Sequence, residues 1–293
     1  MALQFNEPVM KRDSYVLFPA KDAGRNIDEM PKLLGDNRYP LPFAGSMKLK
    51  LRAFDLYASV LENPDQFTPE YRAKAADFFK DVWSNYVDTG DAIFRRPDGS
   101  TKINLVNPQT ARDSEFLKLI APQNKKNLRN GAIGLPFGMY DSANVATEFG
   151  KAEMKKFTDK PYSGDGVLDN RIWMILARNP NEVPKDLAED PELLRTFTKA
   201  VNYLSALAFG YDKNMGVYTS NPQDVETGRL WCADRLGGGS DANGRGRLGD
   251  DGSRLVGVAP EAPRLAVPST ERLEEIIAKL KPHESEVKQL LAA

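Results

Sequence analysis

The sequence predicts an α+β fold in which helices dominate the body, accompanied by a β-hairpin and by a turn-rich region with short strands. Three observations lead to this prediction. Apolar residues recur at helical spacing in several long segments. Two apolar runs flank the turn-forming sequence PDGS at 97–100. Beyond residue 210, glycines and short apolar runs replace the helical pattern. Extended segments are expected at both termini.

These patterns divide the chain into four regions. We expect an extended N-terminal arm at 1–45, a mainly helical body at 46–210, a loop and β-hairpin region with a glycine-rich loop at 211–268, and C-terminal helices at 269–293. A length of 293 residues is compatible with one or two domains. The hydrophobic content of 41% is sufficient for a core.

An antiparallel pair of helices is predicted first in the body. The first helix covers 46–62 and ends at Asn63, which precedes a proline. The second covers 68–90, because Thr68 is a good N-cap, a proline and an acid follow it, and Gly90 is a typical helix end. The sequence at 92–106 then predicts a β-hairpin.

Further helices are predicted at about 109–120, 142–157, 190–210 and 270–281, with a short helix at the C-terminus. The sequence at 168–180 is consistent with a helix or with a buried strand, since its apolar run is short. Short strands are expected at 215–219, 254–258 and 264–267.

The N-terminal arm is interrupted by five prolines, which disfavour regular structure. A short strand is expected at 14–18 and at most two helical turns at 26–35. The arm is nevertheless apolar, so its hydrophobic side chains need a cover from this chain or from a neighbour. We therefore predict an interface arm that contains Phe5, Val16, Phe18, Leu33 and Phe43.

Composition argues against several classes of protein. The net charge is −1, so the basic excess of many nucleic-acid-binding proteins is absent. The single cysteine, Cys232, cannot form an intramolecular disulfide, which favours a reducing compartment. The first residues lack the apolar run of a signal peptide, and no window reaches the roughly 18 apolar residues of a membrane span. A cytoplasmic protein is expected, or a virion protein if the source is viral.

The single histidine, His283, is the most informative feature of the composition. Histidine is the commonest metal ligand and the usual general base near neutral pH. With a single peripheral histidine and a single cysteine, structural zinc sites, metalloprotease motifs and Ser–His or Cys–His triads are essentially excluded within one chain. We expect no metal and no cofactor, and a non-catalytic protein is favoured over an enzyme.

The glycine-rich segment 231–255 lacks the Gly-Lys-Ser/Thr ending of a phosphate loop and the spacing of a dinucleotide-binding turn. Two alternatives stay open. Its aspartates allow an irregular calcium loop, and Arg245 and Arg247 allow contact with phosphates. The favoured interpretation is a long, mobile surface loop.

Outside that segment, two polar groups are candidate sites. Asp165 and Asp169 are four residues apart, a spacing that paired catalytic acids can have. Lys125, Lys126 and Arg129 form a local basic cluster within a connector rich in Gly, Pro and Asn. Both patterns are also typical of ordinary solvated turns.

The favoured function is a non-catalytic structural or assembly protein that works in an oligomer, with copies of itself or with other structural subunits. The concrete version is a virion component, such as a capsid, connector or tail-associated protein. One alternative is a histidine-independent, carboxylate- or Mg²⁺-dependent enzyme on a sugar or phosphate substrate, with candidate acids Asp165, Asp169, Asp241 and Asp250. The other alternative is a nucleic-acid-binding adaptor that uses Arg245, Arg247, Lys125, Lys126 and Arg129.

Overall fold

The computed structural model describes residues 3–4, 15–18, 25–107, 110–143, 147–158, 161–162, 164–178, 191–210, 214–249, 253–260 and 268–292. Its strands form one mixed sheet, and the α+β prediction is confirmed. The main path of the sheet is β1 (Leu3–Gln4), β2 (Tyr15–Phe18), β12 (Ser253–Val258), β4 (Tyr86–Arg95), β10 (Thr227–Ala233), β11 (Ala242–Gly244) and β9 (Val217–Thr219). Beside this path lie β3 (Tyr39–Pro40), β5 (Thr101–Asn104), β6 (Leu128–Arg129), β7 (Ala132–Gly134) and β8 (Thr147–Phe149).

The antiparallel pair β4–β10 forms the centre of the sheet. Thr227 lies opposite Arg95, and the pairing continues to Ala233 opposite Val87, with an irregularity between Leu230 and Cys232. Every residue of β10 is buried, and every residue of β4 after the first. On its outer side β4 pairs in parallel with β12. The predicted hairpin is confirmed, because β5 pairs with β4 across the turn at 96–100.

The start of β4 corrects the predicted length of the second helix. That helix ends at Ser84, and Tyr86 to Gly90, which we expected to be helical, belong to the strand. Pairing with β10 and β12 overrides the local helical pattern there. Gly90 is required by a close approach rather than by a helix end, since a Cβ on it would lie 2.7 Å from the Pro40 ring.

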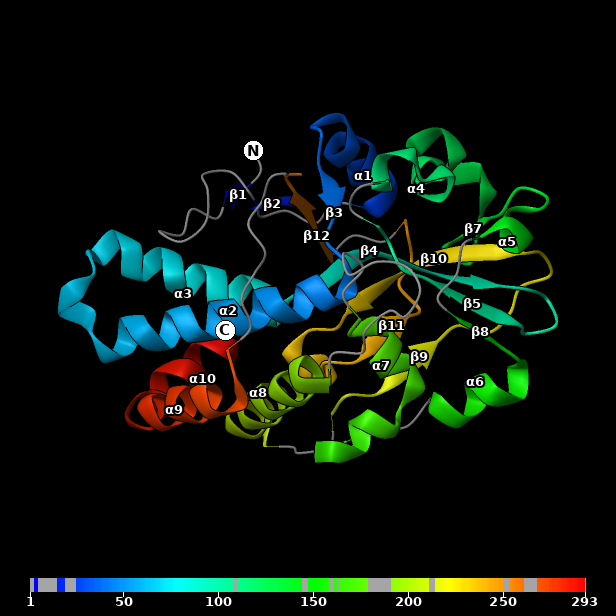
Figure 1. Ribbon diagram of the computed structural model, residues 1–293. Coiled ribbons are helices and arrows are strands. Elements are labelled where there is room, and N and C mark those ends of the chain that lie inside the picture. Colours follow the sequence, from blue (N-terminus) through cyan, green and yellow to red (C-terminus); the bar gives the residue numbers. More distant parts are fainter. Residues whose placement is uncertain are drawn as a thin grey trace.

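The predicted helix pair is confirmed as α2 (Phe43–Glu62) and α3 (Pro69–Ser84), which project to one side of the sheet (Figure 1). The Thr68 side chain accepts a hydrogen bond from the Tyr71 amide, so the predicted cap is also confirmed. Between these helices, Phe54, Phe79 and Trp83 pack their rings together with no exposed surface. Their burial supplies much of the first core, which continues onto the sheet.

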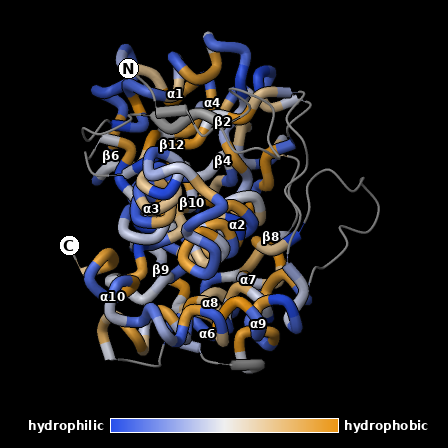
Figure 2. The backbone as a smooth tube through the Cα atoms, turned by 90° about the vertical axis from the view of Figure 1, so that its left-hand side faces the viewer, coloured by the Kyte–Doolittle hydropathy of each residue, from blue (hydrophilic) through white to orange (hydrophobic). Residues whose placement is uncertain are grey.

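Three more helices cover the same core. They are α8 (Pro191–Phe209), α9 (Thr270–Leu280) and α10 (Glu284–Ala292), and each has one buried face. Figure 2 shows hydrophobic and hydrophilic residues mixed along α2, α8 and α9, as expected for helices that are half covered. The Ser269 side chain caps α9 by accepting from the Arg272 amide.

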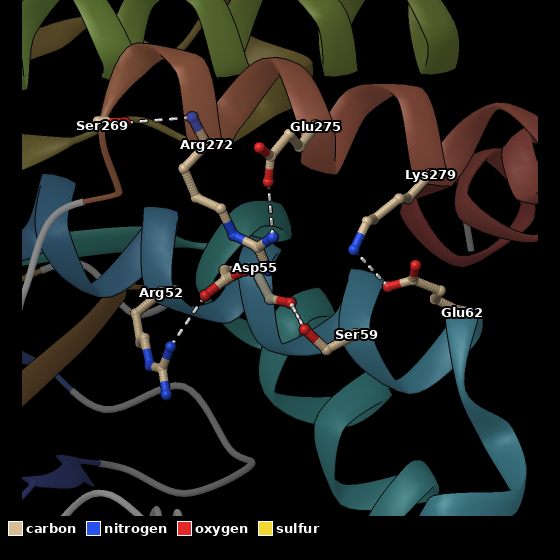
Figure 3. A network of polar contacts seen from close by, with 8 residues as sticks. All are labelled: Arg52, Asp55, Ser59, Glu62, Ser269, Arg272, Glu275 and Lys279. Atoms are coloured by element: carbon tan, nitrogen blue, oxygen red, sulfur yellow. Dashed lines mark hydrogen bonds and ion pairs between the residues drawn. The ribbon is translucent and has the colours of Figure 1, made fainter.

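Ion pairs on α9 join the C-terminal helices to α2 (Figure 3). Arg272 donates to Asp55 at 3.1 Å, and Lys279 donates to Glu62 at 2.7 Å. Beneath them Leu273 and Leu280 are completely buried. The C-terminal helices therefore belong to the core of their own chain, and do not need a neighbour to cover them.

A second core lies on the other face of the sheet, under α1 (Asn26–Gly35) and α4 (Glu115–Leu119) (Figure 1). Helix α1 is ten residues long, more than the two turns expected for this part of the arm. Its apolar residues Ile27, Met30 and Leu33 have helical spacing and are all fully buried. This burial compensates for Pro31, which removes one hydrogen bond within the helix.

The segment around residue 150 also differs from the prediction of a single helix at 142–157. It contains α5 (Met139–Ser142), β8 and α6 (Lys151–Phe157) in succession. Residues 147–149 pair with β5, and this pairing interrupts the helical pattern. For 168–180, where the sequence allowed a helix or a buried strand, the structure has a helix, α7 (Arg171–Leu176), which is capped by the Asn170 side chain.

No helix in the described ranges combines the length and the apolar composition that a membrane crossing needs.

Asp91 joins three parts of this framework and provides a test of it. Its buried carboxylate accepts from the amide of Phe43, at the start of α2, at 2.7 Å, and from the amide of Val106 at 2.6 Å. We predict that Asp91→Ala lowers the free energy of unfolding by about 2–5 kcal/mol, because two buried amides lose their acceptor. Urea unfolding measures this.

Asp98→Ala is the matched control. Asp98 accepts from the Ser100 amide in an exposed turn, so its loss is expected to cost less than about 1 kcal/mol. Equal effects of the two substitutions would contradict the role assigned to Asp91.

Candidate functional site

The glycine-rich segment is folded into the sheet wherever it is described, so the expected mobile surface loop is wrong for residues 231–249. The segment supplies the end of β10, a short 3₁₀ turn at Leu236–Gly238, and β11. Leu236, Ala242 and Leu248 are buried. The loop is therefore part of the core, and only some of its polar side chains face solvent.

Two buried polar side chains hold this segment in place. The Arg229 guanidinium donates to the backbone carbonyls of Arg245 and Gly246, both at 3.0 Å, and to that of Asn130. The Asp241 carboxylate accepts from the Gly216 amide at 2.7 Å. Burial raises the pKa of Asp241 to about 7. These groups stabilise the backbone, which accounts for their burial.

Lys50 is a buried ionisable residue that we did not single out from the sequence. Its ammonium group donates to the Asp234 carbonyl at 2.8 Å and lies 5.3 Å from the centre of the Trp83 ring. Burial lowers its pKa to about 8. Its position in the sequence indicates this burial. Lys50 lies three residues after Met47 and four before Phe54, which is the helical spacing of the apolar residues on the buried face. It has no exposed surface, so it is a structural residue here.

The carboxylates of the enzyme alternative are not assembled by the described structure. Asp169 is exposed at the end of the 3₁₀ helix Gly164–Asp169, whereas Asp241 is buried and bonded to backbone. The side chain of Asp165 and the whole of Asp250 lie outside the described residues. Within those residues, no three His, Cys, Asp or Glu side chains are grouped so that they could hold a metal.

The predicted basic residues lie mostly around one turn. Lys125 and Lys126 are in the 3₁₀ helix Pro122–Asn127, and Arg129 follows in β6. Arg247 lies against Gly131, in the turn between β6 and β7. Lys125 pairs with Asp28 at 2.8 Å. The tertiary structure thus brings Arg247 to the cluster around residue 125 that the sequence suggested.

Arg245, in contrast, faces a different neighbour. Its guanidinium lies 4.9 Å from the centre of the Tyr218 ring and donates to the Thr219 carbonyl at 3.0 Å. It therefore supports β9 from the end of β11.

Two residues of the predicted interface arm are covered by their own chain. Leu33 lies in the second core and Phe43 in the first, both without exposed surface. Val16 and Phe18 belong to β2, where their backbones pair with Gly257 and Leu255. Phe5 lies outside the described residues.

One part of the surface carries exposed apolar side chains. In the described part of the chain, the exposed large hydrophobic side chains are Phe137 (108%), Val225 (41%) and Phe209 (40%). Val225 lines one cavity of about 340 Å³, and Phe137 directly follows Leu135 and Pro136, which also line it. The cavity is lined by Leu119, Asn127, Arg129, Ile133, Gly134, Leu135, Pro136 and Val225. We call the cavity together with Phe137 the Phe137 surface. The neighbouring elements β7 and α5 lie at the end of the molecule away from the tip of α2–α3 (Figure 1).

The backbone that carries Phe137 is fixed on both sides. The Leu135 amide donates to the Glu226 carbonyl at 2.9 Å, and the Met139 amide donates to the Pro136 carbonyl at 3.1 Å. Gly138 has a φ of 80°, a conformation that is strained for residues with a side chain. Glycine at this position therefore allows the tight turn. Phe137 is thus held in an exposed position by an ordered turn.

Tyr140 anchors the helix that follows. It is completely buried, and its ring lies 4.2 Å from the Arg96 guanidinium carbon and 4.7 Å from the Lys102 ammonium. Its hydroxyl donates to Glu148 at 3.1 Å. Two cations on one ring, with a carboxylate at its end, fix the segment that presents Phe137.

The sequence contained one signal for this site. Phe137 is an aromatic residue between Pro136 and Gly138 in a connector otherwise rich in polar residues. The cavity beside it had no sequence signal, because Leu119, Ile133 and Val225 come from separate parts of the chain.

A second cavity, of about 400 Å³, is more polar. It lies between β5 and α4 and is lined by Gly90, Asn104, Leu105, Val106, Asn107, Thr110, Ala111, Asp113, Ser114 and Phe116. In the described part of its lining, the Ser114 side chain already accepts from the Leu117 amide as the cap of α4.

Comparison with known proteins yields little. No family model matches the sequence, and no curated protein matches it. A solved structure described as "Accommodation of massive sequence variation in Nanoarchaeota by the C-type lectin fold" is 16% identical, with a TM-score of 0.48. The match covers 82% of this chain and 99% of that one. A likeness of this size establishes neither a common fold nor a common function.

The buried Lys50 predicts a pH dependence of stability. Because its folded pKa of about 8 lies below the ordinary 10.5, the folded state binds fewer protons than the unfolded state between these values. Stability therefore rises with pH over that window, by up to about 3 kcal/mol. Urea unfolding between pH 7.5 and 10.5 measures the slope.

Lys50→Met is the control for this slope, because methionine keeps most of the side-chain volume and has no proton to lose. We expect a flatter profile for the variant over the same range. An identical rise in both proteins would show that the slope comes from another group.

Proposed function

We propose that this protein is a non-catalytic assembly protein that works in an oligomer, and that it contacts a neighbouring subunit through the Phe137 surface. The observation that carries the proposal is a fully exposed phenylalanine next to a mainly apolar cavity. An exposed aromatic ring together with adjoining apolar surface is typical of a site that a partner covers.

The rigidity of the surface supports the same proposal. Binding is weakened when side chains and loops must be ordered on contact. Here the turn around Phe137 is already held by backbone hydrogen bonds and by the buried Tyr140. A pre-ordered aromatic side chain next to a pocket has the properties of an interface hot spot.

The use made of the buried charges also favours a non-catalytic role. The carboxylates of Asp91 and Asp241 accept hydrogen bonds from backbone amides. The Arg229 guanidinium donates hydrogen bonds to backbone carbonyls. The single histidine, His283, lies beside Glu286 near the C-terminus. Each of these groups has a structural explanation.

Phe137→Ser tests the proposal. We expect the full-length chain to show a mass above 32.6 kDa by light scattering after size exclusion, and the average mass to rise with concentration. The substitution should weaken this association at least about thirtyfold, as for a hot-spot residue worth about 2 kcal/mol.

Phe209→Ser is the matched control, since Phe209 is also an exposed phenylalanine but lies at the end of α8. It should leave the association unchanged. A wild-type mass of 32.6 kDa at every concentration would overturn self-assembly, and equal effects of the two substitutions would overturn the choice of surface.

A further inference from the structure

We infer that the subunit seated on the Phe137 surface is a second copy of this chain, related by a twofold axis, with the Phe137 ring of each copy in the cavity of the other. This inference rests on the proposed function and adds the identity and the geometry of the partner. It is carried by the contents of the surface itself.

The Phe137 surface carries both a projecting ring and a cavity. Leu135 and Pro136 line the cavity, and Phe137 follows them directly in the chain. Phe137 is fully exposed, so its ring does not occupy the cavity of its own chain. In a twofold contact the same patch of both copies forms the interface, so that patch must contain both the projecting group and the cavity that receives it.

The chemistry of the cavity favours an aromatic ligand. Its walls are mainly aliphatic, from Leu119, Ile133, Leu135 and Val225, and its volume of about 340 Å³ exceeds that of a phenyl ring. Arg129 lines the same cavity. A guanidinium above an inserted ring adds a favourable cation–π contact to the burial of the ring. An aromatic side chain is therefore the ligand that this cavity fits.

The Phe137 surface also carries charges of both signs. The exposed Arg129 lines the cavity, and the exposed Asp224 precedes the lining residue Val225. In the proposed dimer we expect the Arg129 of one copy to pair with the Asp224 of the other. Opposite charges at the rim favour this register over a sliding contact.

A closed dimer is the expected product. An interface that is the same patch on both copies is complete once two chains have met, so this contact does not propagate into filaments. Growth beyond two chains would need a different surface.

Cysteine cross-linking tests the geometry directly. In a Cys232→Ala background, which removes the single native thiol, Phe137→Cys and Val225→Cys are made as separate proteins, so that no bridge can form within one chain. Mixed under mild oxidation, they should give a covalent dimer joined between positions 137 and 225. A mixture of Phe209→Cys with Val225→Cys is the matched control and should give none.

Charge exchange tests the register without a cross-link. Arg129→Asp and Asp224→Arg are each expected to weaken the dimer about tenfold, and the double variant is expected to recover most of the wild-type affinity. Light scattering over a range of concentrations measures both. A double variant weaker than either single variant would overturn the register.

The outcomes separate the two levels of the proposal. A dimer without the 137–225 cross-link, or species that grow past two chains in proportion to concentration, overturns the twofold insertion and leaves assembly standing. A monomer at every concentration overturns both. A dimer that is cross-linked at these positions and restored by the double charge variant supports both.

Discussion

The pairing of β4 with β10 is the constraint on which the rest of the structure depends. Both strands are buried along almost their whole length, so neither face of the sheet can be left to solvent. Ile93 faces the core under α2 and α8, and Phe94 faces the core under α1 and α4. Helices must therefore cover the sheet on both sides, and segments from the whole chain are recruited to do so.

Buried charges hold the recruited segments against this sheet. The Asp91 carboxylate of β4 accepts a hydrogen bond from the amide at the start of α2. Lys50 of α2 donates to the backbone carbonyl that follows β10, and Arg229 of β10 donates to backbone carbonyls of two loops. Each places a charge where water is excluded, which is costly unless hydrogen bonds compensate. The perturbed pKa values of Asp91 and Lys50 therefore reflect their burial, although perturbed values are also common in catalytic sites.

The function proposed here follows from the apolar groups that stay exposed after the helices and the glycine-rich segment have packed against the sheet. The helices bury their apolar faces within the chain, and the glycine-rich segment is fastened to the sheet. In the described part of the chain, the Phe137 surface combines an ordered, exposed aromatic side chain with a mainly apolar cavity. In the proposed dimer, a second copy of the chain would supply both a ring for the cavity and a cavity for the ring.

Local signals in the sequence predicted the helix pair, with bounds of 46–62 and 68–90, together with the Thr68 cap and the hairpin after residue 92. These depend on spacing and on hydrogen bonds between near neighbours, which a sequence displays directly. Only the tertiary structure decided that 86–90 is a strand, that Lys50 is buried, and that the glycine-rich segment is core. Those outcomes depend on partners more than a hundred residues away, such as Trp231 for Thr89 and Asp234 for Lys50. The same holds for the cavity beside Phe137, because a cavity exists only between segments that folding has brought together.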